Sequence, residues 1–162
     1  MTTTTRHITQ VHLDEWVKGS GVSEEIARLN LESLDDPNLI ARRLNWKAYK
    51  GTPGWWASGI DPRTCQSRAF GQFKPNEPIQ MPDDDPAKYV TGPKGSPTEA
   101  FFANIGYATY WQRILDDPTE LVAITEGFKK SASGINADVP TVAIAGVWNG
   151  QINKKRLIPD LE

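Results

Sequence analysis

The sequence has few of the features that identify a protein class directly. Cys65 is the one cysteine among 162 residues, which excludes an intramolecular disulfide and a multi-cysteine zinc site. The first residues lack the apolar core of a signal peptide, and no later run approaches the length of a membrane span. We therefore expect a soluble protein of the reducing cytoplasm that has no membrane partner.

An excess of charge of one sign is also missing. Lys and Arg total 18 and Asp and Glu total 20, for a formal net charge of -2. Phosphate binding depends on clustered cations, so any contact with nucleic acid must come from a local basic patch. A chain of this length suits one domain, or one domain with a smaller subdomain.

The first third of the chain reads as helical. The apolar spacing from Val11 to Leu34 predicts two helices separated by Gly19-Ser20-Gly21. This predicted hairpin is rich in acidic residues, which favours a structural or partner-docking role over contact with a nucleic-acid backbone. A further short helix is expected over 38–45, and a basic, aromatic cluster of Arg42, Arg43 and residues 46–50 suits either single-stranded nucleic acid or an ordinary half-buried surface.

The middle of the chain is rich in glycine and proline. Alternation over 68–74 predicts a strand or curled ribbon, and the apolar residues of 100–115 predict a helix. We divide the chain into an N-terminal helical region (1–50), a Gly/Pro-rich β-containing segment with a helix (51–118) and an α/β segment (119–162). The expected fold class is α/β, or α+β overall.

The most informative stretch is 121–130. An apolar run over 121–125 predicts a buried strand that ends at Glu126 and Gly127, and a helix is expected over 128–136 before a strand over 140–145. Two strands joined by a helical crossover imply a parallel pair. Ligands collect beyond the carboxyl ends of such strands, so Glu126 is the candidate functional carboxylate. The alternative is that Glu126 only favours the positive end of the following helix.

Taken in order, four segments resemble the catalytic core of bacterial and phage primases, whose second half is a Toprim fold. They are 68–74, Lys88-Tyr89 with the Gly-Pro turn after it, 124–127 with Lys129-Lys130, and Gly146-Val147. More closely, nearly the whole chain resembles a Toprim-like domain of unknown function in large replication proteins of cyanobacteria, plasmids and phages. The resemblance implies an N-terminal helical hairpin and short β-ribbons leading into a partial Toprim-like parallel sheet.

The resemblance also implies roles for individual residues. Glu126 matches the Toprim glutamate, a general base or acid in nucleotidyl transfer that helps to hold Mg²⁺. The implied ligands are single-stranded DNA or RNA and nucleotides, and the implied partner is the helicase or primase module of a larger replication protein. Residues matching nucleic-acid or nucleotide contacts, several on one basic ridge, are Arg68, Lys74, Lys88, Lys94, Lys129 and Lys130.

The chain departs from the Toprim pattern in its acidic residues. A Toprim site also needs an Asp-x-Asp pair on a third strand, and its expected place lies beyond Glu162. Asp160 and Glu162 have the spacing of such a pair, but no apolar strand positions them after Pro159. One interpretation is therefore an incomplete metal-dependent primase-like enzyme. The second is a non-catalytic module that binds nucleic acid or docks to a replication protein, with Arg42, Arg43 and Lys47 among its cations, and the third is a pure scaffold.

Overall fold

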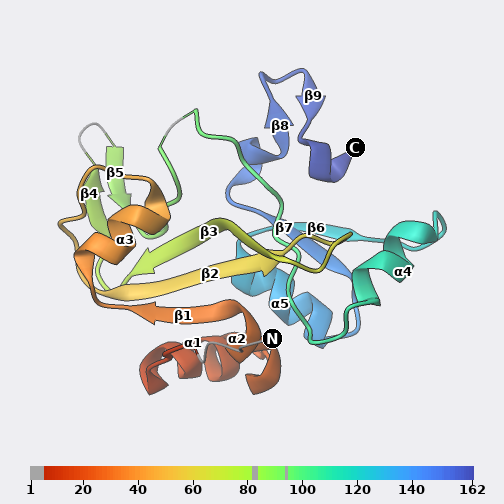
Figure 1. The fold of residues 1–162 in the computed structure, drawn as a ribbon, viewed down its shortest axis with the longest axis horizontal. Coiled ribbons are helices and arrows are strands. Elements are labelled where there is room, and N and C mark those ends of the chain that lie inside the picture. The colour runs from red at the N-terminus through yellow and green to blue at the C-terminus, as the bar shows by residue number, and fades with distance from the viewer. Residues whose placement is uncertain (1–5, 82–83, 94) are drawn as a thin grey trace.

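A three-stranded antiparallel sheet lies at the centre of the N-terminal half (Figure 1). The computed structural model describes residues 6–81, 84–93 and 95–162. The strand order is β1 (Leu31–Leu34), β2 (Gly54–Ile60) and β3 (Ser67–Pro75). Every residue of β2 is buried, because side chains alternate between two hydrophobic clusters: Trp55 belongs to one and Trp56 to the other.

The predicted N-terminal helical hairpin is present beside β1 (Figure 1). Its helices are α1 (Gln10–Ser20), which ends at Gly21 with a φ of 67°, and α2 (Glu24–Asn30), which Ser23 caps. Trp16 of α1 is fully buried and meets Trp55 edge to face at 5.5 Å. The predicted helical region extends too far, because its last residues form β1 and pair with β2.

The opposite face of the sheet carries a short helix, α3 (Pro37–Leu44), as predicted. The rings of Tyr49 and Phe73 meet at 5.5 Å in this second cluster. The adjoining small ribbon consists of β4 (Ile79–Met81) and β5 (Asp84–Ala87).

The C-terminal half contains the predicted parallel pair. Strand β6 (Ala123–Glu126), helix α5 (Phe128–Asn136) and strand β7 (Thr141–Ile144) follow one another, and β6 pairs with β7 in parallel register. A mixed α/β architecture is therefore confirmed. Phe128, Ala132 and Ile135 on one face of α5 are buried.

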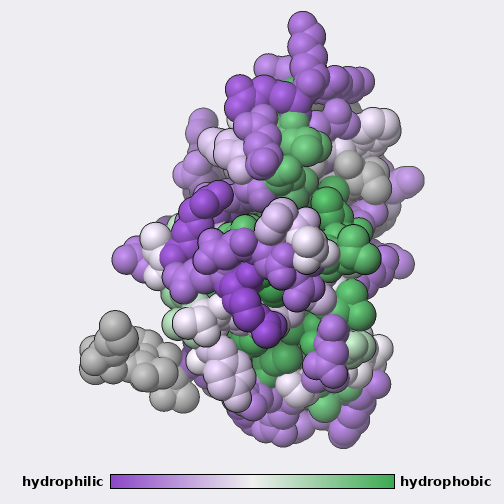
Figure 2. Space-filling view, turned by 90° about the vertical axis from the view of Figure 1, so that its right-hand side faces the viewer, coloured by the Kyte–Doolittle hydropathy of each residue, from purple (hydrophilic) through white to green (hydrophobic). Residues whose placement is uncertain are grey.

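Strand β6 is not the buried strand that its apolar sequence predicted. Ile124 is 58% exposed and the preceding Leu121 is 87% exposed. Figure 2 shows this side of the molecule, where green hydrophobic surface lies between purple polar residues. The physical reason is that β6 pairs with β7 on one side only, so it is an edge strand of a two-stranded sheet.

The predicted helix over 100–115 is wrong over most of its length. Only α4 (Tyr110–Asp116) is helical. Residues 100–103 are buried and run between the two sheets: the Phe101 and Ala143 backbones exchange two hydrogen bonds, and the Ile60 N–H donates to the Phe102 carbonyl at 2.9 Å. This short segment therefore joins the central sheet to the parallel pair.

The last segment is an arm that projects at the top of Figure 1. It begins with a 3-10 turn (Val147–Gly150) and continues through β8 (Gln151–Ile152) and β9 (Arg156–Leu157), paired antiparallel, to a final 3-10 turn (Pro159–Leu161). The main hydrophobic cluster contains residues from all three segments into which we divided the sequence. Within the described part of the chain, no helix is long and apolar enough to cross a membrane.

Candidate functional site

A crevice lies at the carboxyl ends of β6 and β7. It has a volume of about 440 Å³ and brings together Glu126, Lys88, Lys129 and Lys130, four of the residues that the sequence predicted. Gln72 of β3 and Gly146 after β7 also line it. The crevice is therefore built from segments of both halves of the chain, with one carboxylate among three ammonium groups.

Local backbone geometry explains how one short segment supplies so much of this crevice. Gly127 has a φ of 90°, in the region that favours glycine, and its N–H donates to the Ile144 carbonyl at 3.1 Å. The chain therefore turns directly from β6 into α5. No side chain caps this helix, so the positive end of its dipole and the amide groups of its first turn lie beside Lys129 and Lys130.

Glu15 of α1 links two of the predicted cations. Its carboxylate accepts hydrogen bonds from the Lys74 Nζ at 2.8 Å, the Lys129 Nζ at 2.8 Å and the Trp55 Nε1 at 3.0 Å. Burial alone would raise the pKa of Glu15, but the bonds from Lys129, Lys74 and Trp55 outweigh it and lower this pKa to about 2. Glu15 is therefore ionised at neutral pH and fixes both lysines.

The charge available in the crevice depends on which lysines already have a counterion. Lys129 and Lys74 are paired with Glu15. Across residues 6–81, 84–93 and 95–162, no ion pair joins Lys88 or Lys130 to a carboxylate. These two ammonium groups are the cations that the crevice presents to an anion.

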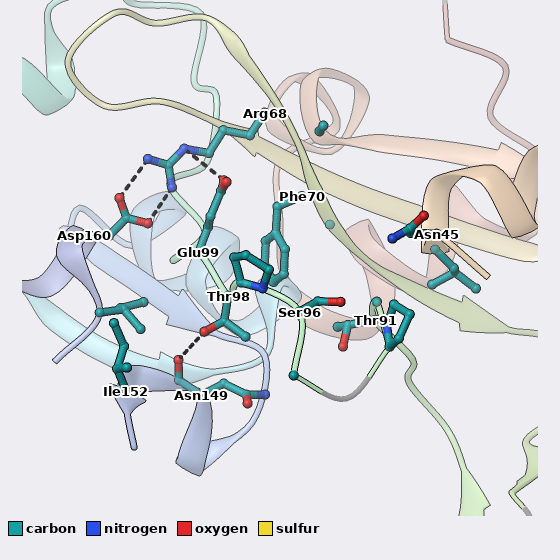
Figure 3. A pocket seen from close by; sticks show the side chains of 18 of the residues that line it. Asn45, Arg68, Phe70, Thr91, Ser96, Thr98, Glu99, Asn149, Ile152 and Asp160 are labelled. Carbon is teal, nitrogen blue, oxygen red and sulfur yellow. Dashed lines mark hydrogen bonds and ion pairs between the residues drawn. The ribbon is translucent and has the colours of Figure 1, made fainter. Parts of the chain in front are cut away.

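Arg68 lies outside this crevice, so the predicted basic ridge is not one continuous surface. Lys74 follows Arg68 by six positions on β3, about 20 Å along the strand. The Arg68 guanidinium lines a larger cleft of about 990 Å³ and binds both carboxylate oxygens of Asp160, with Nη2 to Oδ1 at 2.8 Å (Figure 3). Glu99 lies 3.4 Å from its Nε.

The remaining predicted charges lie elsewhere. Asp160 binds Arg68 and Glu162 binds Arg156 at 3.1 Å, so these two acids do not form a metal-binding pair. Arg43 pairs with Glu32 at 2.9 Å, and Arg42 and Lys47 are exposed. Lys94 lies outside the described residues. Within the described ranges, no group of three or more His, Cys, Asp or Glu residues could hold a metal ion.

Sequence reasoning missed Glu15. Its partners follow it by 40, 59 and 114 residues, so no local pattern contains them. The available signal was an acidic residue beside the buried Trp16 on an amphipathic helix, which placed Glu15 near the core boundary without identifying its counterions.

Comparison with known proteins extends the description of the C-terminal part. Residues 110–162 match the family model described as "Domain of unknown function (DUF3854)". An uncharacterized protein of Picosynechococcus sp. (strain ATCC 27264 / PCC 7002 / PR-6) is 30% identical over 204 residues that include 96% of this chain. The chain spans 20% of the length of that relative. No solved structure matches.

Proposed function

We propose that this chain is a Toprim-like, primase-related domain that binds phosphate groups of single-stranded DNA or RNA, or of a nucleotide, in the crevice around Glu126. The observation that carries the proposal is the meeting of Lys88 and Lys130 with the uncapped start of α5 in one pocket. The order of these residues along the chain also resembles that of the primase core. The helicase or primase module of a larger replication protein is the proposed partner.

The chemistry of the crevice favours an anion. Helix N-termini bind phosphate because their amide groups and dipole both favour negative charge, and ammonium groups add charge-assisted hydrogen bonds of their own to the same anion. A volume of about 440 Å³ lies within the range of small-molecule sites. Lys88 and Lys130 approach from different segments of the chain, so a phosphate between them would be held from two sides.

The same crevice does not fit a magnesium site of its own. Glu126 is the one carboxylate among its described lining residues, whereas Mg²⁺ prefers an octahedral set of oxygen ligands. The binding proposal therefore requires no metal. Metal-dependent nucleotidyl transfer, with Glu126 as general base, is the second candidate function, and its support is the place of Glu126 at the carboxyl end of a parallel strand.

The first prediction concerns Lys88 and Lys130. We expect Lys88→Ala and Lys130→Ala each to weaken binding of labelled single-stranded DNA and RNA by about five- to tenfold, because each removes an ammonium group without its own counterion. Fluorescence anisotropy at several salt concentrations measures this, and the salt dependence should fall with each lost phosphate contact. Glu126→Gln should leave binding unchanged or tighten it, since it removes a negative charge.

Lys18→Ala is the matched control. Lys18 is an exposed lysine on α1 that is paired with Asp14 and does not line the crevice, and its loss should not change affinity. Binding that requires magnesium and is abolished by Glu126→Gln would replace the metal-independent proposal with the second candidate. Equal affinity of the wild type, Lys88→Ala and Lys130→Ala would reject the crevice as a phosphate site.

A further inference from the structure

The projecting arm exposes an aromatic ring among cations. Trp148, just before β8, is 71% exposed, and the Lys154 Nζ lies 6.0 Å from its ring centroid. Lys154, Lys155 and Arg156 are consecutive and exposed. Asn153 and Lys154 both have positive φ, 51° and 56°, so a tight turn between β8 and β9 presents Lys154 and Lys155 at the end of the arm. The top of Figure 2, where the arm projects, is purple.

The arm also forms one wall of the large cleft. Gln151, Ile152 and Asn153 line that cleft together with Thr91, and Thr91 lines the Glu126 crevice as well. On β3, Gly71 lines the large cleft and the next residue, Gln72, lines the crevice. The crevice and the large cleft are therefore adjacent, and together they extend from Glu126 to the arm.

The large cleft, which lies between the Glu126 crevice and the arm, suits the uncharged part of a ligand. The Arg68 charge is already matched by Asp160 and Glu99 on its walls. The Trp56 indole also lines the cleft, and its Nε1 is buried without a hydrogen-bond partner. Gly71 leaves room for that ring, since an added Cβ would lie 2.4 Å from the Cε2 atom bonded to Nε1. The walls of this cleft therefore carry an indole ring and an arginine whose charge is already balanced, which suits an uncharged group.

We propose that the arm is a second contact for single-stranded nucleic acid, which runs from the Glu126 crevice across the large cleft and stacks a base on Trp148. The proposal rests on the proposed function of the crevice. A surface of aromatic rings and cations suits single-stranded nucleic acid, because the rings stack on bases and the cations contact phosphates. Arg156 is paired with Glu162, so Lys154 and Lys155 supply the phosphate contacts.

The test compares a strand of about 12 nucleotides with a 5′-phosphorylated dinucleotide, which is too short to reach from the crevice to the arm along the proposed path across the large cleft. Trp148→Ala should weaken binding of the longer strand about tenfold and leave the dinucleotide unchanged. Trp148→Phe should restore most of the affinity, since a phenyl ring still stacks. The double variant Lys154→Ala/Lys155→Ala should lower the salt dependence of the longer strand by about one phosphate contact or more.

Tyr107→Ala is the control, because Tyr107 is also 72% exposed but lies before α4 rather than on the arm. Equal weakening by Tyr107→Ala and Trp148→Ala, or no effect of Trp148→Ala on the longer strand, would overturn the proposal. Binding to anionic phospholipid vesicles that needs Trp148, with unchanged binding to the strand, would assign the arm to a membrane surface instead. A separate result would reject the proposed function of the crevice. In that case Lys88→Ala would not change the affinity for the dinucleotide, whether or not Trp148→Ala weakens binding of the longer strand.

Discussion

Glu15→Gln is expected to lower the unfolding free energy of the protein at neutral pH. It should also make this free energy fall less as the solution becomes acidic. The side chains of Lys74 and Lys129 are 27% and 21% exposed, so the substitution leaves two largely covered ammonium groups without their shared counterion. The pKa of Glu15 is about 2 in the folded protein against an ordinary value of 4.5. Because this pKa is lowered, the stabilisation is fully present above pH 4.5 and is lost as the pH falls towards 2.

The size of the effect follows from the same shift. The difference between the two pKa values corresponds to about 3 kcal/mol of unfolding free energy as an upper limit, since partial exposure screens the pair. Urea unfolding of the wild type and Glu15→Gln between pH 7 and pH 2 measures it. The two curves should differ most at pH 7 and converge in acid.

Asp14→Asn provides the comparison for this experiment. Asp14 neighbours Glu15 on α1, and its partner Lys18 is 74% exposed, so its loss should change stability little. A pH-independent difference between wild type and Glu15→Gln would show that the carboxylate charge does not hold the two lysines. Glu15→Gln also frees Lys129 of its counterion beside the crevice, so phosphate binding by the folded variant should be unchanged or tighter.

The elements with strong local signals were predictable from the sequence. Gly21 and Gly127 both adopt positive φ at the ends of elements that the sequence placed correctly. Helix α5 lies where its apolar spacing placed it, and the parallel pairing of β6 with β7 followed because a helical crossover between two strands leaves little alternative. Three members of the candidate site, Glu126, Lys129 and Lys130, come from this one short segment.

The errors arose where burial depends on distant neighbours. The apolar run at 121–125 resembles a core strand, but apolarity does not say whether another strand covers the outer edge of β6. Residues 100–103 are all buried, and a short, continuously buried run cannot be assigned to helix or extended chain by periodicity. Arg68 was placed on the correct strand, yet Asp160, 92 residues later, decides which cleft it faces.

Phe101→Ala is expected to have the largest effect on stability, because Phe101 joins the two sheets. Its side chain is 2% exposed and stacks on Phe128 of α5 with ring centroids 4.3 Å apart. Its backbone pairs with Ala143 of β7. Removing the ring leaves a cavity where β2, α5 and β7 meet, so we expect a loss of about 3–5 kcal/mol in unfolding free energy. Phe101→Leu, which keeps most of the volume, should cost much less.

Thermal and urea unfolding give the size of this loss, and hydrogen exchange shows where it acts. The amide of Ala143, which donates to the Phe101 carbonyl at 3.1 Å, should lose protection more than amides within the central sheet, since the contact between the two halves is the part that weakens. Lys88 lies two residues before Val90, which pairs with Phe73 of β3, whereas Lys130 lies on α5. Phe101→Ala should therefore also weaken phosphate binding under conditions where the protein stays folded. If Phe101→Ala cost no more than Tyr107→Ala, an exposed aromatic substitution, residues 100–103 would not be what joins the two sheets.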